Sequence, residues 1–135
     1  MKLDLASLKK AIGSLERAIS RSLAAPEDEE LRDAVIQRFE YSYELSWRML
    51  KRRLELDAPT PASIDALAFK DLIREGAERG LIAKPQAWFE YRRQRNITTH
   101  TYDEEKAKQV HKAAMDFLQD AKGLLQELER RNASP

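Results

Sequence analysis

The sequence has no cysteine, and it contains only two histidines and four glycines. Without cysteine the chain has no disulfide bond, no thiolate metal site and no thiol nucleophile. It also has no continuous apolar run as long as a membrane span, and its first ten residues, MKLDLASLKK, alternate charged and apolar side chains, unlike a signal peptide. These absences predict a cytoplasmic protein with no membrane segment.

Charge of neither sign dominates, because 24 lysines and arginines are balanced by 23 aspartates and glutamates, for a formal net charge of +1. This balance argues against nucleic-acid binding through bulk positive charge, although a local cluster can still bind a phosphate. The composition, 42% hydrophobic and 35% charged, is typical of a globular protein with much exposed helix. The 135 residues predict a single helical domain over residues 1–130, with a frayed C-terminal tail at 131–135.

Apolar residues recur at steps of three and four along most of the chain, which is the spacing of one helix face. The pattern predicts helices over about 5–23, 28–56, 64–80 and 102–128, with a short helix that begins at Pro85. Thr101 and Glu104 have the spacing of a capping box, which predicts that the last helix begins near Tyr102. We therefore predict an all-α fold, an up-and-down helical bundle of four to five helices.

The segment RQRNITTHTYDEE, residues 93–105, differs from the rest because it crowds arginine, threonine, histidine and tyrosine between two helices. Arg95 and His100 are five residues apart, which on an unbroken helix is a rotation of about 140°. The asparagine and threonines between them have low helix propensity and side chains that bond to nearby backbone groups. A bend at this point would let Arg95 and His100 face one pocket.

These two side chains suit the cleavage of a phosphodiester bond. Arginine offers a fixed fork of donors to phosphate oxygens, and histidine exchanges a proton near neutral pH. In RNA the 2′-hydroxyl can attack its own phosphate if a base removes its proton, and this route needs no metal and no cofactor. From the spacing of Arg95 and His100 alone, capping or surface roles at a helix junction are the more common explanation.

The stretch RNITTHTY resembles the signature of the HEPN superfamily, in which an arginine is followed after four residues by histidine and then, one residue later, by tyrosine, in the form seen in HepT toxins. VIQRFEYSYELSWRMLKRRLE resembles the long second helix of the nucleotidyltransferase substrate-binding proteins, and AFKDLIREGAERGLI and AWFEYRRQRNITTHTYDE resemble their later part. The resemblance extends over residues 5–128 and implies a HEPN-like fold. It also implies an endoribonuclease, the toxin of a type II toxin-antitoxin-like pair, that works as a homodimer without metal.

The resemblance assigns roles residue by residue. Arg95 and His100 match the catalytic pair, and Asn96 matches the polar residue that commonly follows the arginine and contributes to substrate binding. Tyr102 matches the tyrosine that a partner nucleotidyltransferase antitoxin of the MntA type modifies with AMP. An AMP group two residues from His100 would exclude an RNA backbone through its bulk and negative charge. Because the chain lacks the glycine-serine and paired-aspartate motif of such transferases, it is expected to be their substrate.

Arg92 and Arg93 have two interpretations. They would guide an RNA substrate toward the catalytic pair, or they form an ordinary solvated helix end. The function of the whole chain likewise has an alternative, a non-catalytic substrate-binding subunit that presents Tyr102 or another group to a nucleotidyltransferase. A third interpretation is a bundle whose motif only caps helices.

Several other residues have simpler structural interpretations. His111 is expected to be a structural histidine beside the apolar seam of the last helix. Glu40 and Glu44 lie one helical turn apart, and an ion pair with Arg48 explains their spacing better than a metal site does. More large aromatic side chains are present than one narrow seam needs, which predicts a homodimer; those side chains are Tyr41, Trp47, Trp88 and Tyr91.

Overall fold

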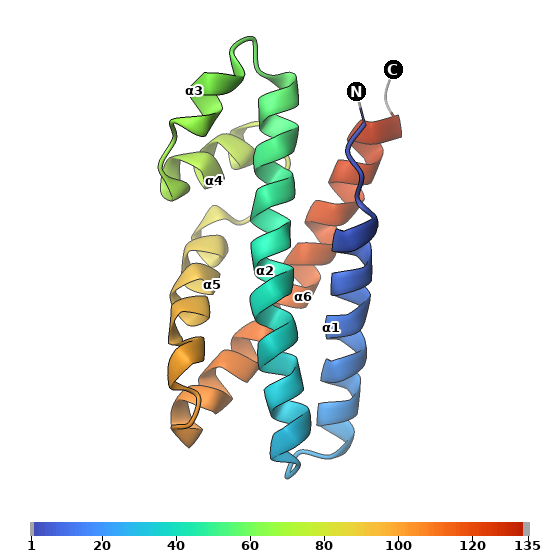
Figure 1. Cartoon of the computed structure of the whole chain (residues 1–135), viewed down its shortest axis with the longest axis vertical. Helices are drawn as coiled ribbons and strands as arrows, with labels where there is room; N and C mark the ends of the chain where they lie inside the picture. Colours follow the sequence, from blue (N-terminus) through green and yellow to red (C-terminus); the bar gives the residue numbers. More distant parts are fainter. Residues whose placement is uncertain (1, 134–135) are drawn as a thin grey trace.

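The computed structural model describes residues 2–133, which form an all-α bundle without strands (Figure 1). The predicted fold class is confirmed. The elements are α1 (Ala6–Ala24), α2 (Glu29–Asp57), α3 (Pro61–Asp65), α4 (Phe69–Glu78), α5 (Pro85–Ile97), the 3-10 helix η1 (Thr98–His100) and α6 (Glu104–Ala133). Within residues 2–133, no helix is both long and apolar enough to cross a membrane.

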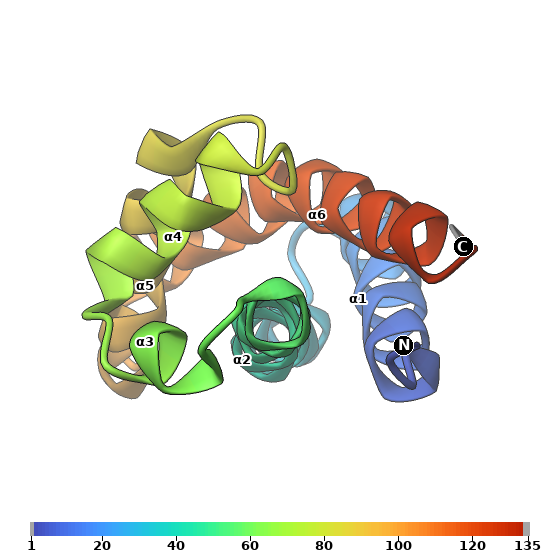
Figure 2. The same ribbon diagram turned by 90° about the horizontal axis from the view of Figure 1, so that it is seen from above.

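Helix α2 is the centre of the bundle and contacts every other α-helix (Figures 1 and 2). It begins where the sequence predicts, because the Asp28 carboxylate accepts hydrogen bonds from the amides of Glu30, at 2.9 Å, and Leu31, at 3.1 Å. Seen from above, α1 and the C-terminal half of α6 lie on one side of α2, and α3, α4 and α5 lie on the other (Figure 2). The site residues on α5 therefore rest on a rigid central helix.

The segment predicted as one helix over 64–80 is divided into α3 and α4, which raises the number of α-helices to six in the described chain. Ile64 of α3 is buried in the core beside α2, whereas Leu72 and Ile73 of α4 are buried where α4 approaches α5. One straight helix cannot bury both sets, so the chain turns between Asp65 and Phe69. Gly80, predicted as the cap, ends α4 with a left-handed φ of 77° that favours glycine.

An aromatic cluster fills the middle of the core. Its ring centroids lie 5.2–6.3 Å apart, mostly in tilted or edge-to-face arrangements, and its members are Phe39, Tyr43, Trp88, Tyr91 and Phe117. Trp88 is 1% exposed and Tyr91 is 4% exposed. The prediction of a homodimer rests partly on Trp88 and Tyr91 as aromatic side chains beyond what the core needs. For these two residues the argument is wrong, because α5 packs both of them inward against α6.

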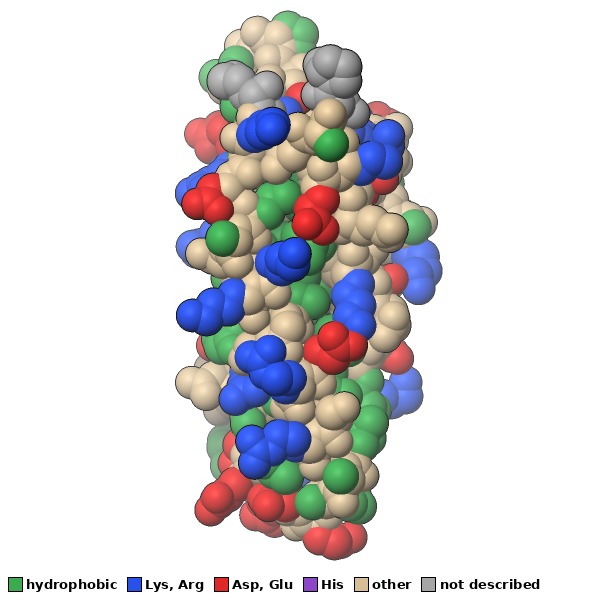
Figure 3. Space-filling model, turned by 90° about the vertical axis from the view of Figure 1, so that its right-hand side faces the viewer, with side chains coloured by type: hydrophobic (Ala, Val, Ile, Leu, Met, Phe, Trp, Pro, Cys, Tyr) green, Lys and Arg blue, Asp and Glu red, His purple; other side chains and the backbone are tan. Residues whose placement is uncertain are grey.

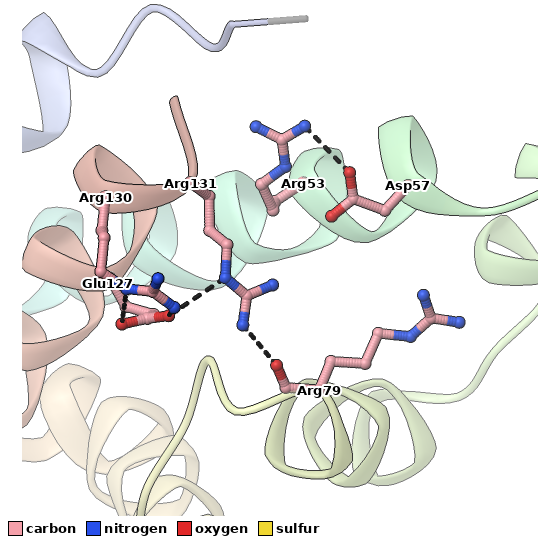
Figure 4. Close-up of polar contacts among 6 residues, drawn as sticks. All are labelled: Arg53, Asp57, Arg79, Glu127, Arg130 and Arg131. Carbon is pink, nitrogen blue, oxygen red and sulfur yellow. Dashed lines mark hydrogen bonds and ion pairs between the residues drawn. The ribbon is translucent and has the colours of Figure 1, made fainter. Parts of the chain in front are cut away.

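Polar contacts fix the far end of α6 to α4 (Figure 4). Glu127 accepts hydrogen bonds from both Arg130 and Arg131, and Arg131 also donates to the backbone carbonyl of Arg79 at the end of α4. Asn132 joins the end of α6 to the N-terminal segment, since its amide donates to the carbonyl of Leu3 at 2.9 Å and accepts from the Leu3 amide at 3.0 Å. Residues 131–133 are therefore helical and anchored, which differs from the predicted frayed tail; residues 134–135 lie outside the described chain.

Candidate functional site

The chain changes direction between Arg95 and His100, as the sequence predicts. Helix α5 ends at Ile97, and Thr98–His100 form the single 3-10 turn η1. The Thr98 hydroxyl lies 2.7 Å from the Arg95 carbonyl and 2.5 Å from a carboxylate oxygen of Glu40, so its proton is shared between two acceptors. This local bonding ends the helix and ties the junction to α2.

Helix α6 begins later than the capping-box spacing predicts. The cap is Asp103, whose carboxylate accepts hydrogen bonds from the amides of Glu105, at 3.0 Å, and Lys106, at 3.2 Å. The Thr101 hydroxyl instead donates to the Thr98 carbonyl at 3.1 Å. Tyr102 therefore lies in the turn before α6, and its side chain is 86% exposed.

Arg95 is held by a residue that the sequence pattern did not connect with it. Its Nε lies 2.9 Å from Oε1 of Glu44 on α2, as an ion pair and not as a well-directed hydrogen bond. The other Glu44 oxygen accepts a hydrogen bond from the Trp47 indole at 3.2 Å and lies 3.7 Å from Arg48. The predicted Glu44–Arg48 pair thus exists, but the shorter contact of Glu44 is with Arg95.

The terminal nitrogens of the Arg95 guanidinium are available to bind a ligand. Its Nε is buried against Glu44, whereas its side chain as a whole is 38% exposed. Over residues 2–133, no hydrogen bond occupies the two terminal nitrogens of Arg95. A guanidinium that is fixed at Nε and open at its terminal nitrogens is oriented to grip a phosphate with its fork of donors.

His100 and Tyr102 lie together at the exposed end of this junction. Their ring centroids are 6.2 Å apart with an interplanar angle of 71°, an edge-to-face contact. Tyr102 also borders an open depression of about 340 Å³ between α2 and the junction, together with Glu40, Thr98 and Thr101. The Tyr102 ring therefore lies beside the His100 ring, and most of it is open to solvent.

The three predicted substrate-binding residues do not form one cluster. The Arg92 guanidinium lies 4.2 Å from the ring centroid of Phe69, in a cation–π contact. Arg93 donates to both carboxylate oxygens of Glu90, at 2.8 and 2.9 Å. These hydrogen bonds, together with one from Gln94, lower the pKa of Glu90 to about 2. Asn96 is exposed. Arg92 lies three residues from Arg95, on the same side of α5, so it is the member of this set that extends the site.

His111 takes part in a separate buried contact. The Ser22 hydroxyl donates to the Ile19 carbonyl at 3.0 Å, so the His111 Nε2, 2.9 Å from the same oxygen, acts as the donor of the second bond. Burial, and to a lesser extent the positive charge of Arg32, lowers the pKa of His111. Within residues 2–133, no three or more histidine and acidic side chains are grouped so that they could hold a metal ion.

Comparisons with known proteins agree on one group of relatives. Residues 3–130 match the family described as nucleotidyltransferase substrate binding protein like. The chain is 41% identical to the probable ribonuclease HepT of Haemophilus influenzae, over 97% of this chain and 95% of that protein. The solved structure of HI0074 from Haemophilus influenzae, described as the fold of a substrate binding domain of a nucleotidyltransferase, superposes with a TM-score of 0.88. It is 39% identical, with 93% of this chain and 99% of that chain covered.

A crystal structure from Thermus thermophilus also superposes, with a TM-score of 0.74 at 27% identity, over 90% of this chain and 98% of that one. The fold seen here is therefore shared over nearly the full length of its relatives.

Proposed function

The chain belongs to the nucleotidyltransferase substrate binding protein-like family, and we propose that within it the protein is a metal-independent HEPN-type endoribonuclease. The proposal makes it the toxin of a type II toxin-antitoxin-like pair that acts on RNA in the cytoplasm. Its partner is a nucleotidyltransferase antitoxin of the MntA type, which silences it by AMPylation of Tyr102. The kinship with a probable ribonuclease HepT supports the nuclease part of this proposal.

One observation carries the proposal: Arg95 is fixed by Glu44 with its terminal nitrogens open, at the helix break that leads to His100. Arg95 keeps its fork free while its Nε is anchored, which is the arrangement that transition-state stabilisation at a phosphate requires.

The proposed reaction proceeds through the 2′-hydroxyl of the substrate. His100 takes the hydroxyl proton, and the 2′-oxygen forms a bond to phosphorus while the bond between phosphorus and the 5′-oxygen breaks. The leaving oxygen takes up a proton, so the products are a 2′,3′-cyclic phosphate and a 5′-hydroxyl end. Arg95 stabilises the negative charge that builds on the phosphoryl oxygens.

A homodimer would supply the second proton donor. In this arrangement the motifs of both copies line a shared cleft, where one His100 acts as base and the other as acid. Tyr41 and Trp47 remain as aromatic side chains at the surface, since Tyr41 is 38% exposed and Trp47 is partly buried. Sedimentation at micromolar concentration checks this part of the proposal, and a monomer would contradict it.

The proposed switch uses the exposure of Tyr102. Its phenol oxygen attacks the α-phosphate of ATP held by the partner, a bond from that oxygen to phosphorus forms, and pyrophosphate leaves. The phenol proton passes to a base on the partner. The product carries a phosphate and a nucleoside beside the His100 ring, where they would block RNA and attract Arg95.

A second candidate is a non-catalytic subunit that presents a group to a nucleotidyltransferase. The description of the family and that of the HI0074 structure favour it, because both name substrate binding. The exposed Tyr102 serves this candidate equally well. Only the cleavage chemistry separates the two.

The test combines intact mass with RNA cleavage. The full chain is expressed with and without the partner nucleotidyltransferase, and each form is assayed beside His100→Ala, Arg95→Ala and Tyr102→Phe. We expect AMP-sized mass increments that Tyr102→Phe abolishes, and cleavage by unmodified wild type that falls by at least about 10³-fold in His100→Ala. Mass increments without His100-dependent cleavage would select the non-catalytic candidate. An unchanged mass and no His100-dependent cleavage would overturn the ribonuclease and its switch and would leave a partner-binding helical bundle.

A further inference from the structure

An open pocket of about 470 Å³ lies between α4 and α5, apart from the His100 junction. Phe69 and Phe89 supply its apolar surface, and Lys70, Arg74 and Arg92 supply positive charge. Both aromatic rings are only partly buried and pack against the edge of the core. The pocket thus combines aromatic surface and cations at the rim of the molecule.

The cations are arranged on the rings. The Lys70 ammonium and the Arg74 guanidinium each lie 5.6 Å from the ring centroid of Phe89, and Arg92 lies 4.2 Å from that of Phe69. Asp71 forms an ion pair with Arg74 at 3.2 Å. The pocket therefore has three positively charged side chains and one negatively charged side chain. Partly exposed rings beside arginine and lysine are what proteins use to stack a base and bind the adjoining phosphate of a single strand.

A chain of side-chain contacts connects this pocket to Arg95. The ring of Phe69 lies edge-on to Trp47 with centroids 6.2 Å apart, and the Trp47 indole donates to Glu44, which holds Arg95. Arg92 lies one helical turn before Arg95 on the same side of α5. A strand whose phosphate lies at Arg95 therefore has a positively charged path along α5 to the pocket.

Positive charge alone does not single out this pocket. On the opposite side of the molecule, the side of α1, lysine and arginine side chains are spread over the full length of the face and mixed with acidic ones (Figure 3). What distinguishes the pocket between α4 and α5 is the combination of cations with two aromatic rings, one helical turn from Arg95 through Arg92.

We propose that this pocket binds a nucleotide of the single-stranded RNA substrate next to the cleaved bond. The base stacks on Phe89 and the Arg74 guanidinium, and the adjoining phosphate pairs with Lys70 and Arg92. The assignment rests on the proposed ribonuclease function and names its substrate class as unpaired RNA, because a base in a duplex has no free face to offer.

The test uses a fluorescein-labelled ten-nucleotide oligouridylate and the full chain. Binding is measured by anisotropy in the His100→Ala background, so that the probe stays intact. The pocket variant is Lys70→Ala with Arg74→Ala, and its matched control is Lys9→Ala with Lys10→Ala, two exposed lysines of α1. We expect the pocket variant to weaken binding at least about tenfold and to lower the slope of log affinity against log salt by about 1.4, with a much smaller effect in the control.

A second variant, Phe89→Leu, keeps apolar bulk for packing but removes the ring. It should weaken binding about 5- to 100-fold without changing the salt slope, because stacking carries no charge. In the background with His100 intact, both variants should raise KM for the decamer while kcat at saturation is retained. Thermal melts confirm that each variant is folded.

The outcomes separate this inference from the proposed function. Equal affinity of the pocket variant and its control, with cleavage intact, overturns the pocket and leaves the ribonuclease. If the pocket variant weakens RNA binding but cleavage does not depend on His100, the pocket assignment is supported and the proposed ribonuclease activity is overturned. A change in sedimentation of the pocket variant, with RNA affinity unchanged, would make this surface a subunit interface and overturn the assignment.

Discussion

The Glu44–Arg95 pair yields the most specific prediction, because its disruption separates positioning from folding. The substitution Glu44→Gln keeps the size of the side chain and its ability to accept from Trp47 but removes the charge 2.9 Å from the Arg95 Nε. Without that charge, the guanidinium loses the contact that fixes its direction. We expect RNA cleavage to suffer far more than stability.

The expected magnitudes follow from exposure. The side chains of Glu44 and Arg95 are 25% and 38% exposed, so solvent screens their attraction. A screened pair of this kind contributes about 0.5–1 kcal/mol, which for a domain of this size corresponds to a fall in Tm of about 2–5 °C. A displacement of the guanidinium by about 1 Å costs up to about 100-fold in rate, so we expect kcat to fall by about 10- to 100-fold.

The assay is cleavage of a labelled single-stranded RNA, with kcat and KM determined separately. The control is Glu90→Gln, which removes a carboxylate from the Arg93 pair on α5 and does not touch Arg95. The decisive experiment repeats Glu44→Gln in the Arg95→Ala background, where it should have no further effect on cleavage, because a positioning residue acts only through its partner. An unchanged or raised kcat in Glu44→Gln would refute the reasoning. It would also be refuted if Glu44→Gln lowered kcat by the same factor in the Arg95→Ala background as in wild type.

Three other predictions concern stability. Burial lowers the pKa of His111 in the folded state below its ordinary 6.5, so the unfolded chain binds the proton first and the free energy of unfolding falls as the pH drops below that value. In urea titrations, the free energy of unfolding should fall less from pH 7 to pH 5 in His111→Asn than in wild type. An equal fall in the two proteins would contradict this. Gly76→Ala should cost about 1–3 kcal/mol of stability in thermal melts, because the added Cβ would lie 3.0 Å from a leucine methyl of α2. The Cβ added in Gly123→Ala would have no atom within 4 Å, so this variant should gain about 0.5–1 kcal/mol. Equal melting temperatures of the two variants would refute the crowding at Gly76. Asp103→Ala should lower the free energy of unfolding by about 1 kcal/mol, because Asp103 caps α6. A larger decrease in Thr101→Val would show instead that Thr101 is the cap, as the capping-box spacing predicts.

The parts of the fold that depend on local sequence could be predicted. The long apolar patterns indicated α2 and α6, and Asp28 marked the start of α2 because capping depends only on the next three residues. The helix break after Arg95 followed from the asparagine and threonines that come next. Local pattern could not show that α5 turns Trp88 inward, because a short helix with apolar residues on several sides has no single preferred face.

The site divides in the same way. The motif supplied Arg95, His100 and Tyr102 from one short segment, and their catalytic and acceptor roles stay predictions. The sequence pairs Glu44 with Arg48, four residues away on the same helix, because periodicity displays only neighbours on one helix. The shorter contact of Glu44, with Arg95, depends on how α2 packs against α5.

The reciprocal hydrogen bonds between Leu3 and Asn132 join the segment before α1 to the last turn of α6, at the end of the bundle opposite the His100 junction (Figure 1). A short linker could therefore join residues 3 and 132, with new ends opened between the exposed residues Ala83 and Lys84 before α5, without interrupting any of the long helices. An affinity tag or fluorescent fusion attached beyond residue 3 or residue 132 would equally leave the junction uncovered. The architecture thus allows the protein to be tethered or permuted while the end that carries His100 stays free for assay.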